Sequence, residues 1–185
     1  MSKRIYIFAE NKTVFMKRIS FLILFVLSLA YSYSQENNEK KYPVLPAVEL
    51  KTIDGKTFNT KDIENDGNPV IISLWATWCR PCILELIAIS DVYDDWVEET
   101  GVKLYAVSID DSKTASQVAP FVNGHSWDYV VLQDINSDFK RAMNVVNVPY
   151  LCILNGNGEI VWQHTSYAPG GENEVYEELL KWKKK

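Results

Sequence analysis

The sequence predicts an α/β domain in which helices flank a central mixed sheet. Short runs of β-branched and aromatic residues alternate along the chain with longer stretches of helical periodicity, an alternation typical of layered α/β folds. Two pairs, Asp54-Gly55 and Asn157-Gly158, each separate strand-like runs, and such pairs favour hairpin turns. The chain has 185 residues, 47% of them hydrophobic, so it is long enough to form one full core.

The individual elements follow from changes in the apolar spacing. Val70 to Ala76 is a β-branched and aromatic run of the kind that a buried strand shows. From Pro81 onward, apolar residues recur at nearly helical spacing until Gly101. In chain order we expect a hairpin near 47–60, a strand at 70–76, a helix at 80–99, a strand at 102–109, a helix around 113–123, a strand at 129–132, a short helix at 136–143, strands at 150–154 and 159–164, and a helix at 172–183.

Two cysteines, Cys79 and Cys82, lie where the strand at 70–76 gives way to the following helix. Unpaired amide N–H groups and the positive end of the helix dipole favour a thiolate at Cys79, and Arg80 adds a nearby positive charge. Cys82, one helical turn further along, is placed to attack a mixed disulfide on Cys79 and release its partner. Pro81 fits the first helical turn, where its missing N–H costs little. The pattern predicts a redox-active dithiol with Cys79 as the nucleophile.

Other roles for the cysteines and histidines are less well supported by their spacing. A zinc site needs further ligands, and Cys152, His125 and His164 are not paired at ligand spacing. A purely structural disulfide between Cys79 and Cys82 closes a very short loop and adds little stability. We expect Cys152 to be a small buried apolar residue, with a third redox role as the alternative. Both histidines are expected at the surface.

The segment Trp75 to Cys82 (Trp-Ala-Thr-Trp-Cys-Arg-Pro-Cys) resembles the active-site segment of the thioredoxin superfamily, most of all that of the ResA/TlpA group of exported thiol-disulfide oxidoreductases. The likeness runs from about Pro46 to the C-terminus and includes the segments 50–58, 148–149 and 155–160 and a final amphipathic helix. It implies a thioredoxin-like fold with an N-terminal β-hairpin extension and a central insertion. It also implies a redox-active Cys79-Cys82 disulfide with no cofactor and no metal.

The resemblance implies a role for one carboxylate. Thioredoxins carry a buried aspartate six residues before the first cysteine, where this chain has Ser73. ResA-like proteins instead carry a glutamate three residues after the second cysteine, and Glu85 matches it. Glu85 is then expected to accept the proton that the Cys82 thiol loses before it attacks. Without the resemblance, a lone glutamate on a helix is more often a surface residue.

A substrate surface is also implied. Pro149 matches a proline that sits in a cis peptide opposite the dithiol, and Val148 before it would pair its backbone with an extended substrate segment. Only about 5–6% of X-Pro bonds are cis, so this expectation rests on the resemblance. Trp78 and Arg80, beside the dithiol, complete the expected substrate-binding residues. Trp75 either flanks the same surface or packs in the core.

Two positions depart from the resemblance. Ile87 stands where most relatives have a helix-kinking proline, so we expect a straighter active-site helix. Tyr150 stands where many have a threonine after the cis-proline, so it either alters the substrate surface or fills space.

The N-terminus carries the signals for export. Lys17 and Arg18 precede an apolar run at 19–30, which is followed by the pattern Ser32-Tyr33-Ser34, with small residues at its first and third positions. We expect a secretory signal cleaved after Ser34, with Met16 as a candidate start, because the apolar run falls short of the ~20 residues that a membrane span needs. An uncleaved anchor is the alternative. The expected organisation is an extension and signal peptide at 1–34, a polar linker at 35–45 and the domain at 46–185.

The sequence therefore indicates an exported, monomeric thiol-disulfide oxidoreductase. The resemblance implies reduction of disulfides in exported proteins, such as apocytochrome c, with electrons from a membrane thiol carrier. Thiolate stabilisation by Arg80 and the helix favours the reduced form and so points instead to an oxidase or isomerase. A binding or chaperone module without turnover is a further alternative. The net charge of −5 and the lack of a basic patch argue against nucleic acid as a partner.

Overall fold

The computed structural model describes residues 42–184. The leader, the expected cleavage site after Ser34 and most of the polar linker lie outside these residues. Among the described residues, Tyr42 and Pro43, which precede the boundary expected at 46, already contact the domain. The ring of Tyr42 lies 5.8 Å from that of Trp182, and the N–H of Ile160 donates to the carbonyl of Pro43 at 2.8 Å. In residues 42–184, no helix is long and apolar enough to cross a bilayer.

The described residues form one mixed sheet of seven strands in the order β2-β1-β5-β4-β3-β6-β7. The strands are β1 (Glu49–Thr52), β2 (Thr57–Asn59), β3 (Val70–Trp75), β4 (Lys103–Ser108), β5 (Val130–Gln133), β6 (Tyr150–Leu154) and β7 (Ile160–Thr165). β3, β4 and β5 are parallel, and the other pairs are antiparallel. The predicted hairpins and mixed sheet are thus confirmed. β5, within the expected central insertion, joins the N-terminal hairpin to the rest of the sheet.

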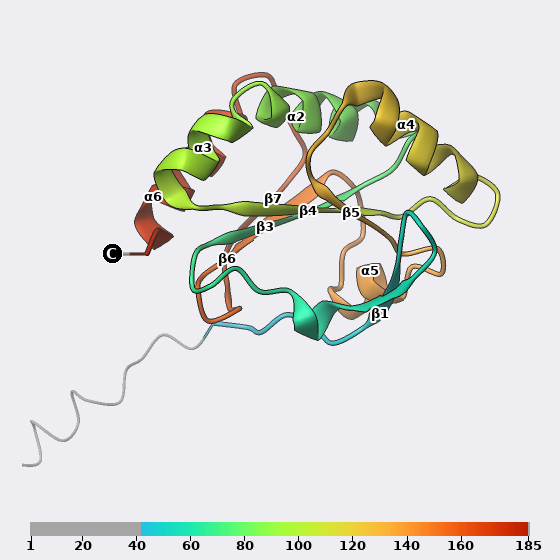
Figure 1. Cartoon of the computed structure of the whole chain (residues 1–185), viewed down its shortest axis with the longest axis horizontal. Helices are drawn as coiled ribbons and strands as arrows, with labels where there is room; N and C mark the ends of the chain where they lie inside the picture. Colours follow the sequence, from blue (N-terminus) through green and yellow to red (C-terminus); the bar gives the residue numbers. More distant parts are fainter. Residues whose placement is uncertain (1–41, 185) are drawn as a thin grey trace, which may run out of the picture. The chain divides into compact units, whose positions relative to one another are not determined.

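Helices lie on both faces of this sheet, as predicted. They are α2 (Arg80–Ser90), α3 (Tyr93–Thr100), α4 (Val118–His125), α5 (Asp138–Ala142) and α6 (Glu172–Trp182), with 3₁₀ turns η1 (Thr60–Asp62) and η2 (Ala115–Gln117). Figure 1 shows α2, α3 and α4 above the sheet and α5 below it. α6 packs against α2 and α3. One layer of helices therefore covers the face on which α2 lies.

The single straight helix predicted for 80–99 is wrong. α2 ends at Ser90, and α3 begins at Tyr93. The segment between them, Ser90-Asp91-Val92, has low helix propensity, and Val92 leaves the helical region with φ −126° and ψ 3°. The break lets the Tyr93 hydroxyl accept the N–H of Leu104 on β4 at 2.9 Å. Position 87 is isoleucine and not a helix-kinking proline, but the chain from 80 to 99 still does not form one continuous helix.

β3 is the centre of the core. All six of its residues are buried, as expected for a strand covered on both faces. Its carboxyl end lies beside that of the parallel strand β4, since Trp75 pairs with Ser108. The chain leaves β3 at this edge and enters α2 through Ala76, Thr77 and Trp78. Loops that follow two adjacent parallel strands are thereby brought together around the start of α2.

Candidate redox site

The dithiol lies at the first turn of α2. Cys79 is the N-cap of the helix, and its Sγ accepts the N–H of Cys82 at 3.4 Å. The two residues form a disulfide with Cα atoms 5.3 Å apart. Cys79 is 6% exposed and Cys82 is completely buried, so a partner reaches Cys79 first. After reduction, the N-terminal amide groups of α2 stabilise a thiolate at Cys79.

A buried carboxylate, Asp110, holds the loop that leads to Cys79. Its Oδ1 accepts the Thr77 hydroxyl at 2.6 Å, and its Oδ2 accepts the Thr77 N–H at 2.9 Å and the Ser108 hydroxyl at 2.7 Å. Asp110 is completely buried, yet both oxygens have donors, as a buried charge requires. Two hydrogen bonds therefore join Thr77, two residues before Cys79, to Asp110, and the third holds Asp110 to Ser108 at the carboxyl end of β4.

A second buried carboxylate, Glu85, lies on the same face of α2 as Cys82. It is 1% exposed, so the surface position typical of a lone glutamate is excluded. Its Oε1 lies 2.7 Å from Nε2 of His164 on β7. Its Oε2 is buried and has no hydrogen-bond partner in residues 42–184. One oxygen of Glu85 is thus held and the other is available.

His164 was predicted at the surface, and the structure contradicts this. Leu151 pairs with both Ser73 on β3 and His164 on β7, so the three side chains share one face of the sheet. Because α2 covers this face, His164 reaches Glu85, and its side chain keeps only 16% exposure. His125, by contrast, is exposed on α4, as predicted.

Val148 and Pro149 are joined by a cis peptide bond, as predicted. Together with Pro81 from α2 they line a groove of about 740 Å³. Other lining residues come from the segment between α5 and β6, from the end of β7 and from the loop after β7, among them Val146, Thr165 and Tyr167. The groove therefore opens between the first turn of α2 and the start of β6.

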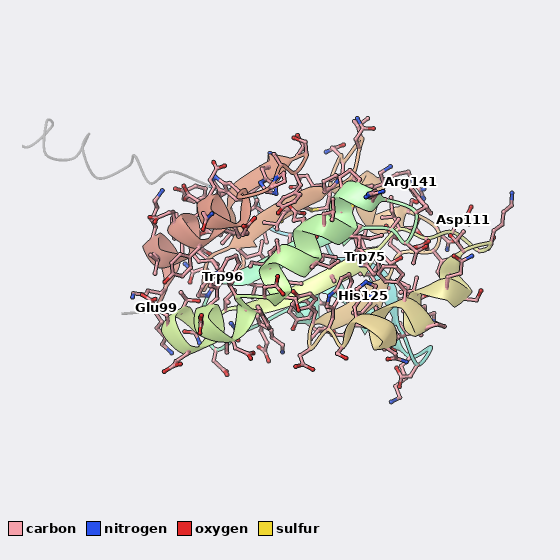
Figure 2. The ribbon with its side chains drawn as sticks, turned by 90° about the horizontal axis from the view of Figure 1, so that it is seen from above. Trp75, Trp96, Glu99, Asp111, His125 and Arg141 are labelled. Atoms are coloured by element: carbon pink, nitrogen blue, oxygen red, sulfur yellow. A yellow bond between two sulfur atoms is a disulfide. The ribbon has the colours of Figure 1, made fainter. Side chains whose placement is uncertain are left out.

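The two expected tryptophans lie in different environments. Trp78 is 61% exposed beside Cys79, whereas Trp75 is completely buried. Trp75 packs edge-on against Trp127 with ring centroids 5.3 Å apart, and Phe121 and His125 extend the aromatic cluster along α4. Figure 2 shows Trp75 and His125 close together beside this helix. Of the two positions considered for Trp75, the core is the one observed. Arg80 is exposed at the first position of α2.

Tyr150 and Cys152 are both buried on β6. Tyr150 lines the groove but is only 5% exposed, and its hydroxyl donates to Oε1 of Gln163 at 2.8 Å. Cys152 is completely buried, which confirms the predicted packing role. Burial raises the pKa of its thiol to about 12, and this makes it a poor nucleophile at neutral pH. In residues 42–184, no group of three His, Cys, Asp or Glu side chains is arranged to hold a metal ion.

Comparison with known proteins identifies the family. The family model described as the AhpC/TSA family matches residues 43–163. The chain belongs to the AhpC/TSA family. Sporulation thiol-disulfide oxidoreductase A of Bacillus subtilis (strain 168) is 30% identical over 147 residues, which cover 78% of this chain and 87% of that protein. Thiol-disulfide oxidoreductase ResA of Oceanobacillus iheyensis is 29% identical over 158 residues, covering 82% and 80%.

Solved structures agree with this assignment. The solution structure of a thioredoxin-like protein from Porphyromonas gingivalis is 52% identical and superposes with a TM-score of 0.68, covering 77% of this chain and 94% of that one. This AhpC/TSA-family protein has a thioredoxin-like fold. It is a thiol-disulfide oxidoreductase of the ResA/StoA type, with Cys79 and Cys82 as its Cys-x-x-Cys pair.

Sequence reasoning missed two residues that the structure places at this candidate site, Asp110 and His164. A signal for Asp110 was present, because it lies two residues after the end of the buried strand β4, whose carboxyl end lies beside that of β3. Residues that follow neighbouring parallel strands meet at one sheet edge. His164 had no comparable signal, because its place opposite Glu85 depends on the pairing of β6 with β7 and on the packing of α2.

Proposed function

We propose that this protein reduces disulfide bonds in exported proteins, with apocytochrome c before haem attachment as one candidate substrate. A membrane thiol carrier supplies the electrons, and the protein acts as a monomer. The observation that carries the proposal is the Cys79–Cys82 disulfide at the start of α2, beside the groove lined by Pro81 and Pro149. An extended polypeptide fits such a groove and brings its disulfide to Cys79.

The reaction consists of two thiol-disulfide exchanges. The Cys79 thiolate attacks one sulfur of the substrate disulfide, and the other substrate sulfur leaves and takes up a proton. The Cys82 thiol then gives its proton to Glu85 and attacks Sγ of Cys79, and the second substrate sulfur leaves and is protonated. The substrate has gained two electrons and two protons, and Cys79 and Cys82 are left as a disulfide. The carrier returns the dithiol form.

Glu85 is the proposed proton acceptor because of its burial and its free oxygen. It lies one helical turn from Cys82 on the buried face of α2, and its Oε2 has no hydrogen-bond partner in the described part of the chain. A positioned base of this kind accelerates a proton-transfer step by about 10²–10⁴-fold.

The proposed docking surface surrounds Cys79. The backbone of Val148 pairs with the extended substrate, Pro149 keeps that segment against the dithiol, and Trp78 offers an exposed aromatic face. Arg80, exposed at the same end of α2, attracts acidic groups of the partner. The surface thus combines an apolar groove with one positive charge.

One buried carboxylate favours the reducing direction. Asp110 is completely buried and hydrogen-bonded to Thr77, two residues before Cys79, so negative charge lies in low dielectric near the dithiol. Such charge opposes thiolate formation, whereas Arg80 acts through solvent and is screened. A less stable thiolate destabilises the dithiol form, and this makes the couple more reducing.

The proposed location is outside the cytoplasm. It rests on the basic residues Lys17 and Arg18 and the apolar run at 19–30, which precede the domain in the sequence. The protein is either released by cleavage after Ser34 or held at the membrane by this run.

Trapping of the substrate tests the proposal. A Cys82→Ser variant cannot resolve the mixed disulfide, so it should accumulate exported proteins on Cys79 that a reductant releases. A Cys79→Ser variant is the matched control and should trap none. If Cys82→Ser traps nothing and Cys79→Ser supports full function in cells, the protein is a binding module without turnover.

A redox titration against glutathione tests the direction. A reductase should equilibrate well below the most oxidising extreme of this protein class, which is about −120 mV. A potential near that extreme would overturn the reducing role and favour an oxidase or isomerase.

A further inference from the structure

We propose that His164 is a positioning residue that releases a proton to solvent when Glu85 receives one from Cys82. The inference rests on the proposed function of Glu85 as proton acceptor. A residue of β7, which lies far from the dithiol in the sequence, would then take part in the exchange step.

The geometry of the pair is the first argument. His164 Nε2 lies 2.7 Å from Glu85 Oε1, within hydrogen-bond distance. The other carboxylate oxygen, Oε2, has no hydrogen-bond partner in residues 42–184. His164 therefore fixes the carboxylate so that only one of its two oxygens is available to a thiol.

Burial is the second argument. Glu85 is 1% exposed, so a proton that arrives there has no direct route to solvent. The His164 side chain is 16% exposed and is the side-chain hydrogen-bond partner of Glu85 in the described residues. A group that touches the buried carboxylate on one side and solvent on the other can couple the two.

The proton balance follows from these contacts. Before resolution, Glu85 is a carboxylate and His164 an imidazolium, so the pair is neutral. Cys82 transfers its proton to Glu85 Oε2, and His164 releases one proton from Nδ1 to solvent, so the pair is neutral again. The Cys82 thiolate attacks Sγ of Cys79, and the sulfur–sulfur bond to the substrate breaks. On reduction of the disulfide the same protons return, and no net charge remains buried.

The titratable groups around this pair differ between the neighbouring elements. Cys82 lies on α2 itself, β3 contributes no titratable side chain, and the β6 residues on this face are Leu151 and Ile153. Tyr167, in the loop before α6, feels the charge of Glu85, and its hydroxyl donates to Glu172 at 2.9 Å. Burial raises the pKa of Tyr167 to about 12, so it keeps its proton at neutral pH.

A His164→Gln variant tests the proposal, because glutamine keeps a hydrogen-bond donor but cannot titrate near neutral pH. The reduced protein is mixed with 5,5′-dithiobis(2-nitrobenzoate), and the second thionitrobenzoate released reports attack by Cys82. We expect this step to slow about tenfold at pH 7, a part of what a positioned base contributes, and to lose its pH dependence between pH 5 and 8. The matched control is His125→Gln on exposed α4, which should keep the wild-type rate and profile.

The result that overturns the proposal is a wild-type rate and pH profile in His164→Gln. A Glu85→Gln variant in the same assay separates the two ideas. If Glu85→Gln is slow and His164→Gln is normal, only the role of His164 fails. If Glu85→Gln is itself normal, the proposed proton acceptor fails.

Proton NMR provides a second test that does not depend on the folding of His164→Gln. The chain has two histidines, so in His125→Gln the remaining ring signal belongs to His164. We expect the midpoint of its titration to differ between the disulfide and dithiol forms. Identical midpoints in both forms would contradict the coupling.

Discussion

Asp110 and Glu85 are both buried carboxylates at the redox end of the domain, but their hydrogen bonding differs. Asp110 accepts three hydrogen bonds from Thr77 and Ser108, which occupy both of its oxygens. Glu85 has one contact, with His164, and its second oxygen has no partner in residues 42–184. Asp110 follows a strand and holds a loop, whereas Glu85 lies on the helix that carries the cysteines.

The comparison separates two uses of a buried charge. A carboxylate whose two oxygens are both satisfied by donors stabilises a conformation and leaves no oxygen free for a further partner. A carboxylate with a free, buried oxygen is costly for stability, and such groups recur where chemistry requires them. We therefore regard Asp110 as a structural tether of the active-site loop and Glu85 as the reactive carboxylate.

Glu85→Gln should have the largest effect on activity. Glutamine has nearly the same shape but cannot accept the Cys82 proton, so turnover of a disulfide-bonded model protein should fall by about 10²–10⁴-fold at neutral pH. Thermal unfolding should change little, because an amide avoids the cost of a buried charge. Unchanged turnover would remove the distinction between the two carboxylates.

Asp110→Asn should reduce stability rather than catalysis. One oxygen becomes an NH₂ group, so a buried donor loses its acceptor at a cost of about 1–3 kcal/mol in the free energy of unfolding. Chemical denaturation measures this loss, and Thr77→Val is the matched variant that removes one donor from the other side. A loss of turnover as large as that of Glu85→Gln, in protein that is still folded, would show that Asp110 takes part in the chemistry.

Alkylation of Cys152 should show the smallest effect of all, because the buried thiol should not react in the folded protein. Its pKa in the folded protein is raised to about 12 from an ordinary value of 9.0. In the oxidised native protein it is the free thiol, and iodoacetamide at pH 8 should leave it unlabelled until unfolding. Rapid labelling of the native protein would revive its third redox role.

The raised pKa of the Cys152 thiol also predicts that the folded protein loses stability at alkaline pH. Between pH 9 and pH 12 the unfolded chain releases this proton while the folded protein keeps it, so the stabilisation is complete below pH 9 and is lost as pH rises. Cys152→Ala should therefore lose less free energy of unfolding than the wild type between pH 8.5 and pH 10. An equal loss in both proteins would contradict the assigned burial of the thiol.

The sequence predicted the architecture well because its signals are local. The strand at 70–76, the hairpin turns and the Cys79–Cys82 helix start depend on residues close together in the chain. Glu85 and the cis bond before Pro149 were expected from resemblance. The end of α2 at Ser90 was missed, since apolar spacing continues in phase through Trp96 although the backbone breaks at Val92.

The contacts that tune the site were not predictable in the same way. Glu85 and His164 are separated by 79 positions, and Thr77 and Asp110 by 33. Each pair meets only because of the order of the strands in the sheet and because the strand register decides which face of the sheet each side chain occupies. A shift of one residue in β7 would turn His164 to the opposite face, so no local pattern could identify it as the partner of Glu85.

The most direct test of this account measures the resolution step alone in Glu85→Gln and Asp110→Asn, side by side. After mixing of the reduced proteins with 5,5′-dithiobis(2-nitrobenzoate), the second release of thionitrobenzoate isolates attack by Cys82 on the mixed disulfide. We predict that Glu85→Gln slows this release by about 10²-fold or more, while folded Asp110→Asn stays near the wild-type rate. Equal slowing in both variants, or a wild-type rate in Glu85→Gln, would contradict the account.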